Sequence, residues 1–121
     1  MRILVAEDFD DTRLMMRLLL EMNGHSVLEA ADGREAVLVA EREHPDLVLM
    51  DLNMPVLDGI EATRLLHESP STASVPVVAL TAHCADSEWR DRALEAGCVE
   101  CVGKPVDFPK LEELIDLVTG G

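Results

Sequence analysis

Five short apolar runs alternate with segments of helical periodicity, and this alternation is the feature that most restricts the fold. The runs are Arg2–Ala6, Ser26–Ala30, Asp46–Met50, Val75–Leu80 and Val99–Val102. The first, third and fourth are nearly continuous hydrophobics, as is typical of strands that are buried on both faces. The second and fifth are weaker and suit the edges of a sheet. Strict alternation of strand and helix predicts a parallel sheet with helices on both faces.

The first predicted helix carries an apolar stripe that we interpret mostly as core. The stripe consists of Leu14, Met15, Leu18, Leu19 and Met22. The pair Asn23-Gly24 is a good C-terminal stop. Asp10 and Asp11 precede the stripe, and we interpret them as helix N-caps rather than metal ligands.

Caps, stops and periodicity predict four further helices. The second follows Asp32-Gly33 and ends before Pro45, and Asp58 caps the third, followed by Gly59 for close packing. The fourth spans Ala85–Ala96 and has the weakest amphipathic pattern. The last carries a regular stripe of Leu111, Leu114, Ile115 and Val118. The chain is therefore expected to form one domain, residues 1–121, with a flavodoxin-like (βα)5 fold and strand order 2-1-3-4-5.

Polar residues follow four of the five predicted strands. Glu7 and Asp8 follow the first, Asp51 the third, Thr81 the fourth and Lys104 the fifth. Ligands of open α/β sheets bind at the carboxyl ends of the strands, so these side chains should converge. Three converging carboxylates repel each other unless a cation joins them. Oxygen ligands select hard cations, which predicts Mg²⁺, with Mn²⁺ as a substitute.

Such a site supports phosphoryl transfer to a carboxylate. Asp51 is the best candidate nucleophile because it ends the central strand, and a carboxylate can form an aspartyl-phosphate. Phosphoryl transfer depends mainly on positioning and charge neutralisation, which Lys104 and Thr81 can supply at the phosphoryl oxygens. A general base is not needed, because a carboxylate is already ionised at neutral pH.

Four motifs occur in order at the strand ends. They are Val5-Ala6-Glu7-Asp8, Met50-Asp51-Leu52-Asn53-Met54-Pro55-Val56-Leu57-Asp58-Gly59, Leu80-Thr81-Ala82-His83 and Lys104-Pro105. The second is similar to the D-x-x-M-P-x-x-D-G signature of receiver domains. With these motifs the whole chain resembles a receiver domain of the two-component response regulators, the CheY-like superfamily.

The resemblance implies a role for each of these residues. Asp51 would be the phosphoacceptor, and Mg²⁺ would be held by Glu7, Asp8, Asp51 and the backbone carbonyl of Asn53. Thr81 and Lys104 would contact the phosphoryl group.

The resemblance also implies a phosphohistidine donor on a histidine kinase or a histidine phosphotransfer protein. The protein would be a signalling phosphoacceptor that catalyses only its own phosphorylation and dephosphorylation. The Lys104-Pro105 bond would be cis, and His83 and Asn53 would tune hydrolysis of the acyl-phosphate.

The sequence departs from the family at Cys101. Most receivers have an aromatic residue three positions before the lysine, and its rotamer changes with phosphorylation. We therefore expect output to run through the loop after the fourth strand, with a downstream protein target bound by the fourth helix and fifth strand region. Phe9 and Met54 are expected to form an apolar rim for the donor. For Trp89, a partner anchor and simple packing on the sheet remain open.

The sequence allows two alternative functions and one alternative site. A Mg²⁺-dependent phosphohydrolase needs a second acid or base and a cap domain, but Asn53 stands two residues after Asp51. A phosphorylation-independent interaction module would be favoured by loss of site residues. Cys98 and Cys101 have C-x-x-C spacing, but alternation along a strand would point them to opposite faces, which argues against zinc or redox function.

Charge and cysteine content limit the partners. The chain has 24 acidic and 10 basic residues, which disfavours direct nucleic-acid binding and anionic membranes. Three cysteines argue against a complete disulfide framework. With no signal peptide or membrane-spanning run in view, a cytoplasmic location is expected. The chain is expected to be a stand-alone receiver or a piece of a hybrid kinase.

Overall fold

The computed structural model describes residues 1–54 and 57–120. The strands are β1 Arg2–Ala6, β2 Ser26–Ala30, β3 Leu47–Asp51, β4 Val77–Thr81 and β5 Glu100–Gly103. The helices are α1 Asp10–Met22, α2 Gly33–Glu43, α3 Gly59–Glu68, α4 Ser87–Ala96 and α5 Phe108–Thr119. All strand pairs are parallel and the order is β2-β1-β3-β4-β5. The predicted flavodoxin-like α/β fold is therefore confirmed.

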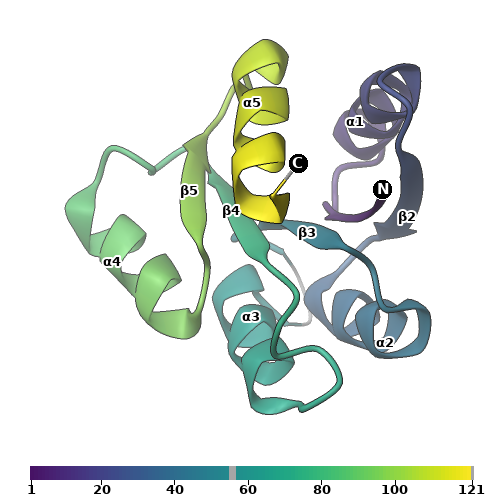
Figure 1. Cartoon of the computed structure of the whole chain (residues 1–121). Coiled ribbons are helices and arrows are strands. Elements are labelled where there is room, and N and C mark those ends of the chain that lie inside the picture. The colour runs from purple at the N-terminus through teal and green to yellow at the C-terminus, as the bar shows by residue number, and fades with distance from the viewer. Residues whose placement is uncertain (55–56, 121) are drawn as a thin grey trace.

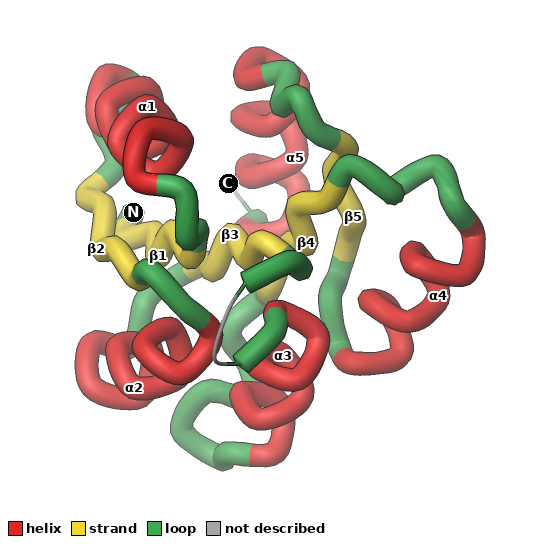
Figure 2. The backbone as a smooth tube through the Cα atoms, turned by 180° about the vertical axis from the view of Figure 1, so that it is seen from behind, coloured by secondary structure: helices red, strands yellow, loops and turns green. Residues whose placement is uncertain are grey.

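The sheet lies between two layers of helices (Figures 1 and 2). Helices α1 and α5 cover one face, and α2, α3 and α4 cover the other. Successive side chains of a strand point to opposite faces. Ile3 and Val5 therefore join the core under α1 and α5, while Leu4 and Ala6 join the core on the other side.

Burial separates the central strands from the edge strands, as their composition predicted. Every residue of β3 and β4 is buried, whereas β2 and β5 are largely half-buried or exposed. The register pairs Ala6 with Met50, Asp51 with Leu80 and Thr81 with Gly103. The carboxyl ends of β1, β3, β4 and β5 are thus aligned at one edge of the sheet.

The predicted core stripe of α1 is wrong. Leu14, Met15 and Leu18 are each about half exposed and Met22 is 80% exposed. The buried residues of α1 are Met16 and Leu20.

The side of α1 that faces the sheet differs from the predicted one because it carries two arginines. Arg13 and Arg17 form ion pairs with Glu29 of β2, so the inward positions are 13, 16, 17 and 20. This set has helical spacing, but half of its members are charged. Hydrophobic periodicity alone therefore selected the adjacent, solvent-facing stripe.

The predicted caps of α1 also need correction. The N-cap position is Phe9, and among the described residues no side chain caps this helix end. Asp10 and Asp11 lie inside the first turn, where a negative charge interacts favourably with the helix dipole. The predicted cap of α3 is confirmed, because the Asp58 carboxylate accepts a hydrogen bond from the Glu61 N–H at 2.9 Å.

In the part of the chain that the structure describes, every helix is too short or too polar to span a bilayer.

Candidate functional site

The three acidic residues at the ends of β1 and β3 lie together. One carboxylate oxygen from each of Glu7, Asp8 and Asp51 can be chosen so that all three atoms lie within 4.8 Å of one another. Glu7 and Asp51 are 2% and 3% exposed, whereas Asp8 faces solvent. Converging oxygen ligands with one open side suit a hard, partly hydrated cation such as Mg²⁺. Among the described residues, this triad is the one cluster of three or more His, Cys, Asp or Glu side chains able to hold a metal ion.

Lys104 reaches the same cluster from the loop after β5. Its Nζ lies 3.0 Å from Glu7 Oε1 and 3.3 Å from Asp51 Oδ2. The Lys104 N–H donates to the Thr81 carbonyl at 3.0 Å, which anchors this loop to the end of β4. The Lys104-Pro105 bond is cis, as the resemblance implied.

Burial sets the electrostatics of the cluster. It is the largest cause that raises the pKa of Glu7 from 4.5 to about 7, and the hydrogen bond with Asp51 adds to this effect, while Lys104 opposes it. Burial alone would lower the pKa of Lys104, but its contacts with Glu7 and Asp51 raise the pKa overall. Lys104 is therefore a cation, and Glu7 binds a proton more readily than an ordinary carboxylate.

The backbone after β3 fixes the Asp51 carboxylate. Asp51 Oδ1 accepts a hydrogen bond from the Asn53 N–H at 3.1 Å. A Cβ atom on Gly59 would lie 2.2 Å from the Asp51 carbonyl oxygen, so only glycine lets α3 approach β3 this closely. Pro55 and Val56 of the signature motif lie outside the described residues.

Thr81 ends β4 and is fully buried. Its Oγ1 accepts a hydrogen bond from the His83 N–H at 3.1 Å, which ties the hydroxyl to the loop that follows.

The His83 ring stacks on Trp89, with centroids 5.5 Å apart, and the Arg92 guanidinium lies 5.0 Å from the Trp89 ring centroid. Trp89 is half-buried against the core. Packing is thus one role of this residue, and the His83 ring lies against α4.

The expected apolar rim forms only in part. Phe9 is 62% exposed beside the acidic cluster, but Met54 is 8% exposed and belongs to the core. A cavity of about 240 Å³ instead adjoins Glu7 and Lys104, with Met15, Pro105 and Phe108 among its lining residues.

The expected separation of Cys98 and Cys101 is wrong. Both side chains lie in the same buried cluster. The reason is that Cys98 lies between α4 and β5, where its N–H donates to the Ala93 carbonyl oxygen, so strand alternation does not apply to it. Cys101 is 6% exposed and occupies the position that we compared with the family's aromatic residue.

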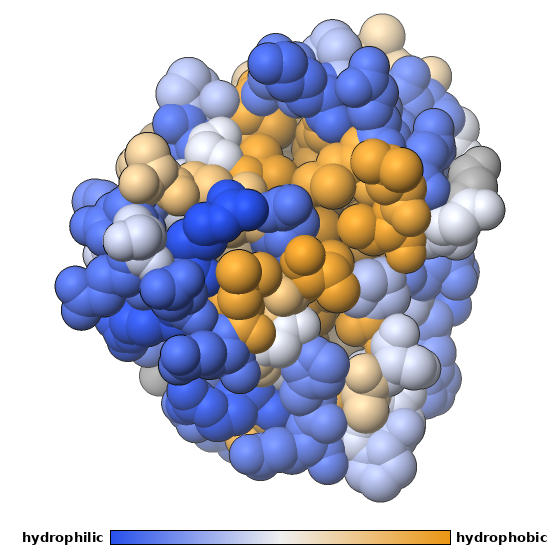
Figure 3. Space-filling model, turned by 60° about the vertical axis from the view of Figure 1, so that its left-hand side comes forward, coloured by the Kyte–Doolittle hydropathy of each residue, from blue (hydrophilic) through white to orange (hydrophobic). Residues whose placement is uncertain are grey.

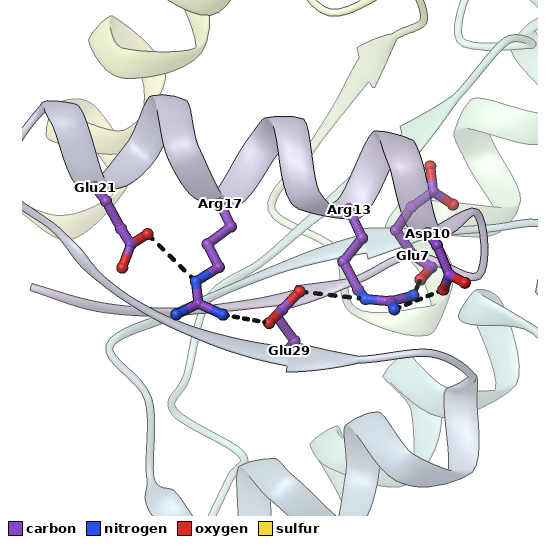
Figure 4. Close-up of polar contacts among 6 residues, drawn as sticks. All are labelled: Glu7, Asp10, Arg13, Arg17, Glu21 and Glu29. Atoms are coloured by element: carbon purple, nitrogen blue, oxygen red, sulfur yellow. Dashed lines mark hydrogen bonds and ion pairs between the residues drawn. The ribbon is translucent and has the colours of Figure 1, made fainter.

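Arg13 is a site residue that the sequence interpretation missed. It donates to the Glu7 carbonyl oxygen at 2.8 Å and pairs with Asp10 and Glu29 (Figure 4). Arg17 continues the ion pairs along α1 through Glu29 and Glu21. The sequence held one indication of this role, because Arg13 and Arg17 lie four positions apart and so share one face of the predicted helix.

The model of the response regulator receiver domain family matches residues 3–116. The chain belongs to this family. Receiver domains are normally signalling phosphoacceptors rather than enzymes with a separate substrate, and they partner with histidine kinases.

The receiver domain is similar in sequence to known response regulators. It is 36% identical to the protein PilH of Pseudomonas aeruginosa over 122 residues, which cover 99% of this chain and 98% of PilH. It is 30% identical to the polar-differentiation response regulator DivK of Brucella ovis, with coverage of 98% and 95%.

Solved receiver structures share the fold. The receiver domain of a sensor histidine kinase from Pseudomonas aeruginosa superposes with a TM-score of 0.91 and 34% identity, covering 99% of this chain and 98% of that one. That structure has a magnesium ion coordinated in its active-site cleft. The acidic cluster of this receiver domain is consistent with a Mg²⁺ site.

Proposed function

We propose that this receiver accepts a phosphoryl group from a phosphohistidine onto the carboxylate of Asp51. The observation that carries the proposal is the position of this carboxylate. It is buried at the end of the central strand, held by the Asn53 N–H and 3.3 Å from the Lys104 ammonium. An ionised carboxylate needs no base to attack phosphorus. The new P–O bond forms as the P–N bond breaks, and the imidazole leaves.

The surrounding residues have distinct roles in the proposal. Glu7, Asp8, Asp51 and the Asn53 carbonyl would hold Mg²⁺, which would neutralise charge on the phosphoryl oxygens. The Lys104 ammonium pairs with a phosphoryl oxygen. The Thr81 hydroxyl donates to another oxygen, while its own oxygen can still accept from His83.

A histidine kinase or a histidine phosphotransfer protein would supply the phosphoryl group. Met15 of α1 lines the cavity beside Glu7 and Lys104, and it shares a second hollow on the same helix with the half-exposed Leu14 and Leu18. This gives the donor an apolar surface next to the acceptor carboxylate.

Output is proposed to use the side of the molecule that carries α4 and β5. Figure 3 looks toward this side and shows apolar surface near its centre, with hydrophilic surface around much of it. Leu94 of α4 and Val99 before β5 are exposed apolar residues of this region. A protein target would bind here with an affinity that depends on phosphorylation. His83 and Cys101 link this side to the site through the loop after β4.

The test is phosphorylation by acetyl phosphate with Mg²⁺, followed by intact mass. Wild type should gain one phosphoryl group that hydroxylamine removes, and Asp51→Asn should gain none. Asp11→Asn is the matched control, because Asp11 is an exposed carboxylate near the site that takes no part in the proposal; it should be phosphorylated like wild type.

The other outcomes discriminate between the alternatives. No mass gain, and no Trp89 fluorescence change with beryllofluoride, in a folded protein that binds Mg²⁺ would favour the phosphorylation-independent interaction module. Sustained release of phosphate over many turnovers would favour the phosphohydrolase.

A further inference from the structure

Two cysteines meet where the loop after β4 crosses β5. Cys84 lies in that loop, and its thiol donates to the Cys101 carbonyl oxygen at 2.9 Å. The Cβ atom of Cys84 is 3.7 Å from the point that a Cβ on Gly103 would occupy. Residues 101 and 103 project from the same face of β5 because they are two positions apart. Cys84 therefore sits over the face of the strand from which Cys101 projects.

Cys84 is also close enough to affect the Cys101 thiol. Burial is the main cause that raises the pKa of the Cys101 thiol to about 12, and the nearby Cys84 thiol raises it further. A disulfide joins Cβ atoms that lie roughly 3.5–4.5 Å apart. Because Cys84 lies over β5, closing such a bond requires its sulfur to turn from the Cys101 carbonyl oxygen toward the Cys101 sulfur.

The surroundings make the two thiols unequal. Cys84 is partly exposed, whereas Cys101 is buried. The Arg90 guanidinium lies 3.8 Å from the Cys84 sulfur and pairs with Glu100 at 2.7 Å, so α4 places a cation beside the outer thiol. Partial exposure and a cationic neighbour are the setting in which protein thiols react with oxidants. The outer thiol is thus placed to react first, with the buried thiol behind it.

We propose that Cys84 and Cys101 are a peroxide-sensitive thiol pair that closes to a disulfide and fastens the β4–α4 loop to β5. The Cys84 sulfur attacks a hydrogen peroxide oxygen, the O–O bond breaks, and a sulfenic acid and water form. The Cys101 sulfur then attacks the Cys84 sulfur, the S–O bond breaks, and a second water leaves. Two thiols and one peroxide thus give one disulfide and two waters, and both thiol protons end in water.

The consequence for the site follows from the loop. His83 precedes Cys84 and holds the Thr81 hydroxyl through its backbone N–H. A disulfide at Cys84 would restrain the segment that holds the Thr81 hydroxyl. Cys101 stands where most receivers have an aromatic residue, so the proposed disulfide would act at that position of this chain.

The first measurement is a disulfide map after treatment with hydrogen peroxide. Cleavage after Glu88, Glu95 and Glu100 places the three cysteines on three different peptides. The expected product is a Cys84–Cys101 cross-linked pair that is two hydrogens lighter than the reduced peptides and is released by dithiothreitol. Only methionine oxidation, a disulfide that contains Cys98, or a cross-link between two chains would overturn the proposal.

Matched variants test the two thiols and the cation. Cys84→Ser and Cys101→Ser should each abolish the disulfide, while Cys98→Ser should retain it, because the Cys98 sulfur instead lies 3.7 Å from the Thr63 hydroxyl. Arg90→Gln should slow disulfide formation several-fold. Equal rates in Arg90→Gln and wild type would refute the role of the cation.

Two measurements test whether the disulfide restrains the β4–α4 loop. Amide hydrogen exchange of residues 82–86 should slow on oxidation in wild type and not in Cys84→Ser, and unchanged exchange would overturn the restraint. The effect on phosphorylation rests on the proposed function. The oxidised protein should be phosphorylated by acetyl phosphate several-fold more slowly than the reduced protein. Equal rates would refute the effect of the disulfide on phosphorylation, whereas the peptide map tests independently whether the disulfide forms.

Discussion

The Lys104 ammonium lies 3.0 Å from the Glu7 carboxylate, although 97 positions separate the two residues in the chain. This contact joins the end of β1 to the loop after β5 across Asp51. Glu7 is 2% exposed and Lys104 is about a quarter exposed at the side chain. The pair brings a cation to two buried carboxylates, and it links the stability of the fold to the charge state of the site.

The raised pKa of Glu7 predicts a pH dependence of stability without Mg²⁺. Its value of about 7 in the folded protein exceeds the ordinary 4.5, so folding favours the protonated form. This contribution is fully present below pH 4.5 and is lost as pH rises through about 7. Urea denaturation in EDTA should therefore show a free energy of unfolding that falls across this interval, more steeply than in Glu7→Gln.

The same proton predicts how Mg²⁺ binding depends on pH. A carboxylate ligand must be deprotonated, so the apparent Mg²⁺ affinity should rise with pH up to about 7 and level off above it. Titration calorimetry in buffers of different ionisation enthalpy would detect the released proton. Equal pH profiles for wild type and Glu7→Gln would contradict both expectations.

Arg13 is predicted to position Glu7 for metal binding. Arg13→Gln removes the hydrogen bond to the Glu7 carbonyl oxygen and should weaken Mg²⁺ binding by up to about tenfold, the lower end of effects seen for groups that orient ligands. Arg17→Gln is the control, because it removes the same charge while Arg17 contacts only Glu21 and Glu29 in this network. Calorimetric Mg²⁺ affinities that change equally in both variants would show that only charge matters.

Gly59 is predicted to be required for the approach of α3 to Asp51. In Gly59→Ala the new methyl group would overlap the Asp51 carbonyl oxygen, which belongs to backbone and cannot rotate away. The free energy of unfolding should fall by about 1–3 kcal/mol. Gly103→Ala is the matched control, since its nearest contact would be an ordinary 3.7 Å to the Cys84 Cβ. A similar loss in both variants would contradict the steric explanation.

The corrected orientation of α1 predicts unequal effects for two leucines. Leu20 is fully buried and Leu18 is 52% exposed. Leu20→Ala should lower the free energy of unfolding by about 2–5 kcal/mol, the range for buried leucines. Leu18→Ala should change it by less than about 0.5 kcal/mol, as expected for surface substitutions. If denaturation showed the larger loss for Leu18→Ala, the stripe first inferred from periodicity would be the true core.

The sequence alone determined the fold and the identity of the acidic cluster. The continuous apolar runs of β1, β3 and β4 can bury their side chains on both faces only between two layers of helices. Alternation of strands with helices makes the sheet parallel. Parallel strands end at the same edge, which brings Glu7 and Asp8 to Asp51 whatever the details of packing. The role of Asp58 as a cap followed equally from local hydrogen bonding.

Only the tertiary structure decided the orientation of α1 and the neighbours of each side chain. Arg13 and Arg17 face the sheet because Glu29 of a distant strand pairs with them, and periodicity counts an arginine as polar wherever it points. Cys84 meets Cys101 because the loop after β4 folds back over β5. Such contacts depend on how elements far apart in the chain pack against each other. Packing and charge pairing determine that arrangement, and the local sequence pattern does not contain it.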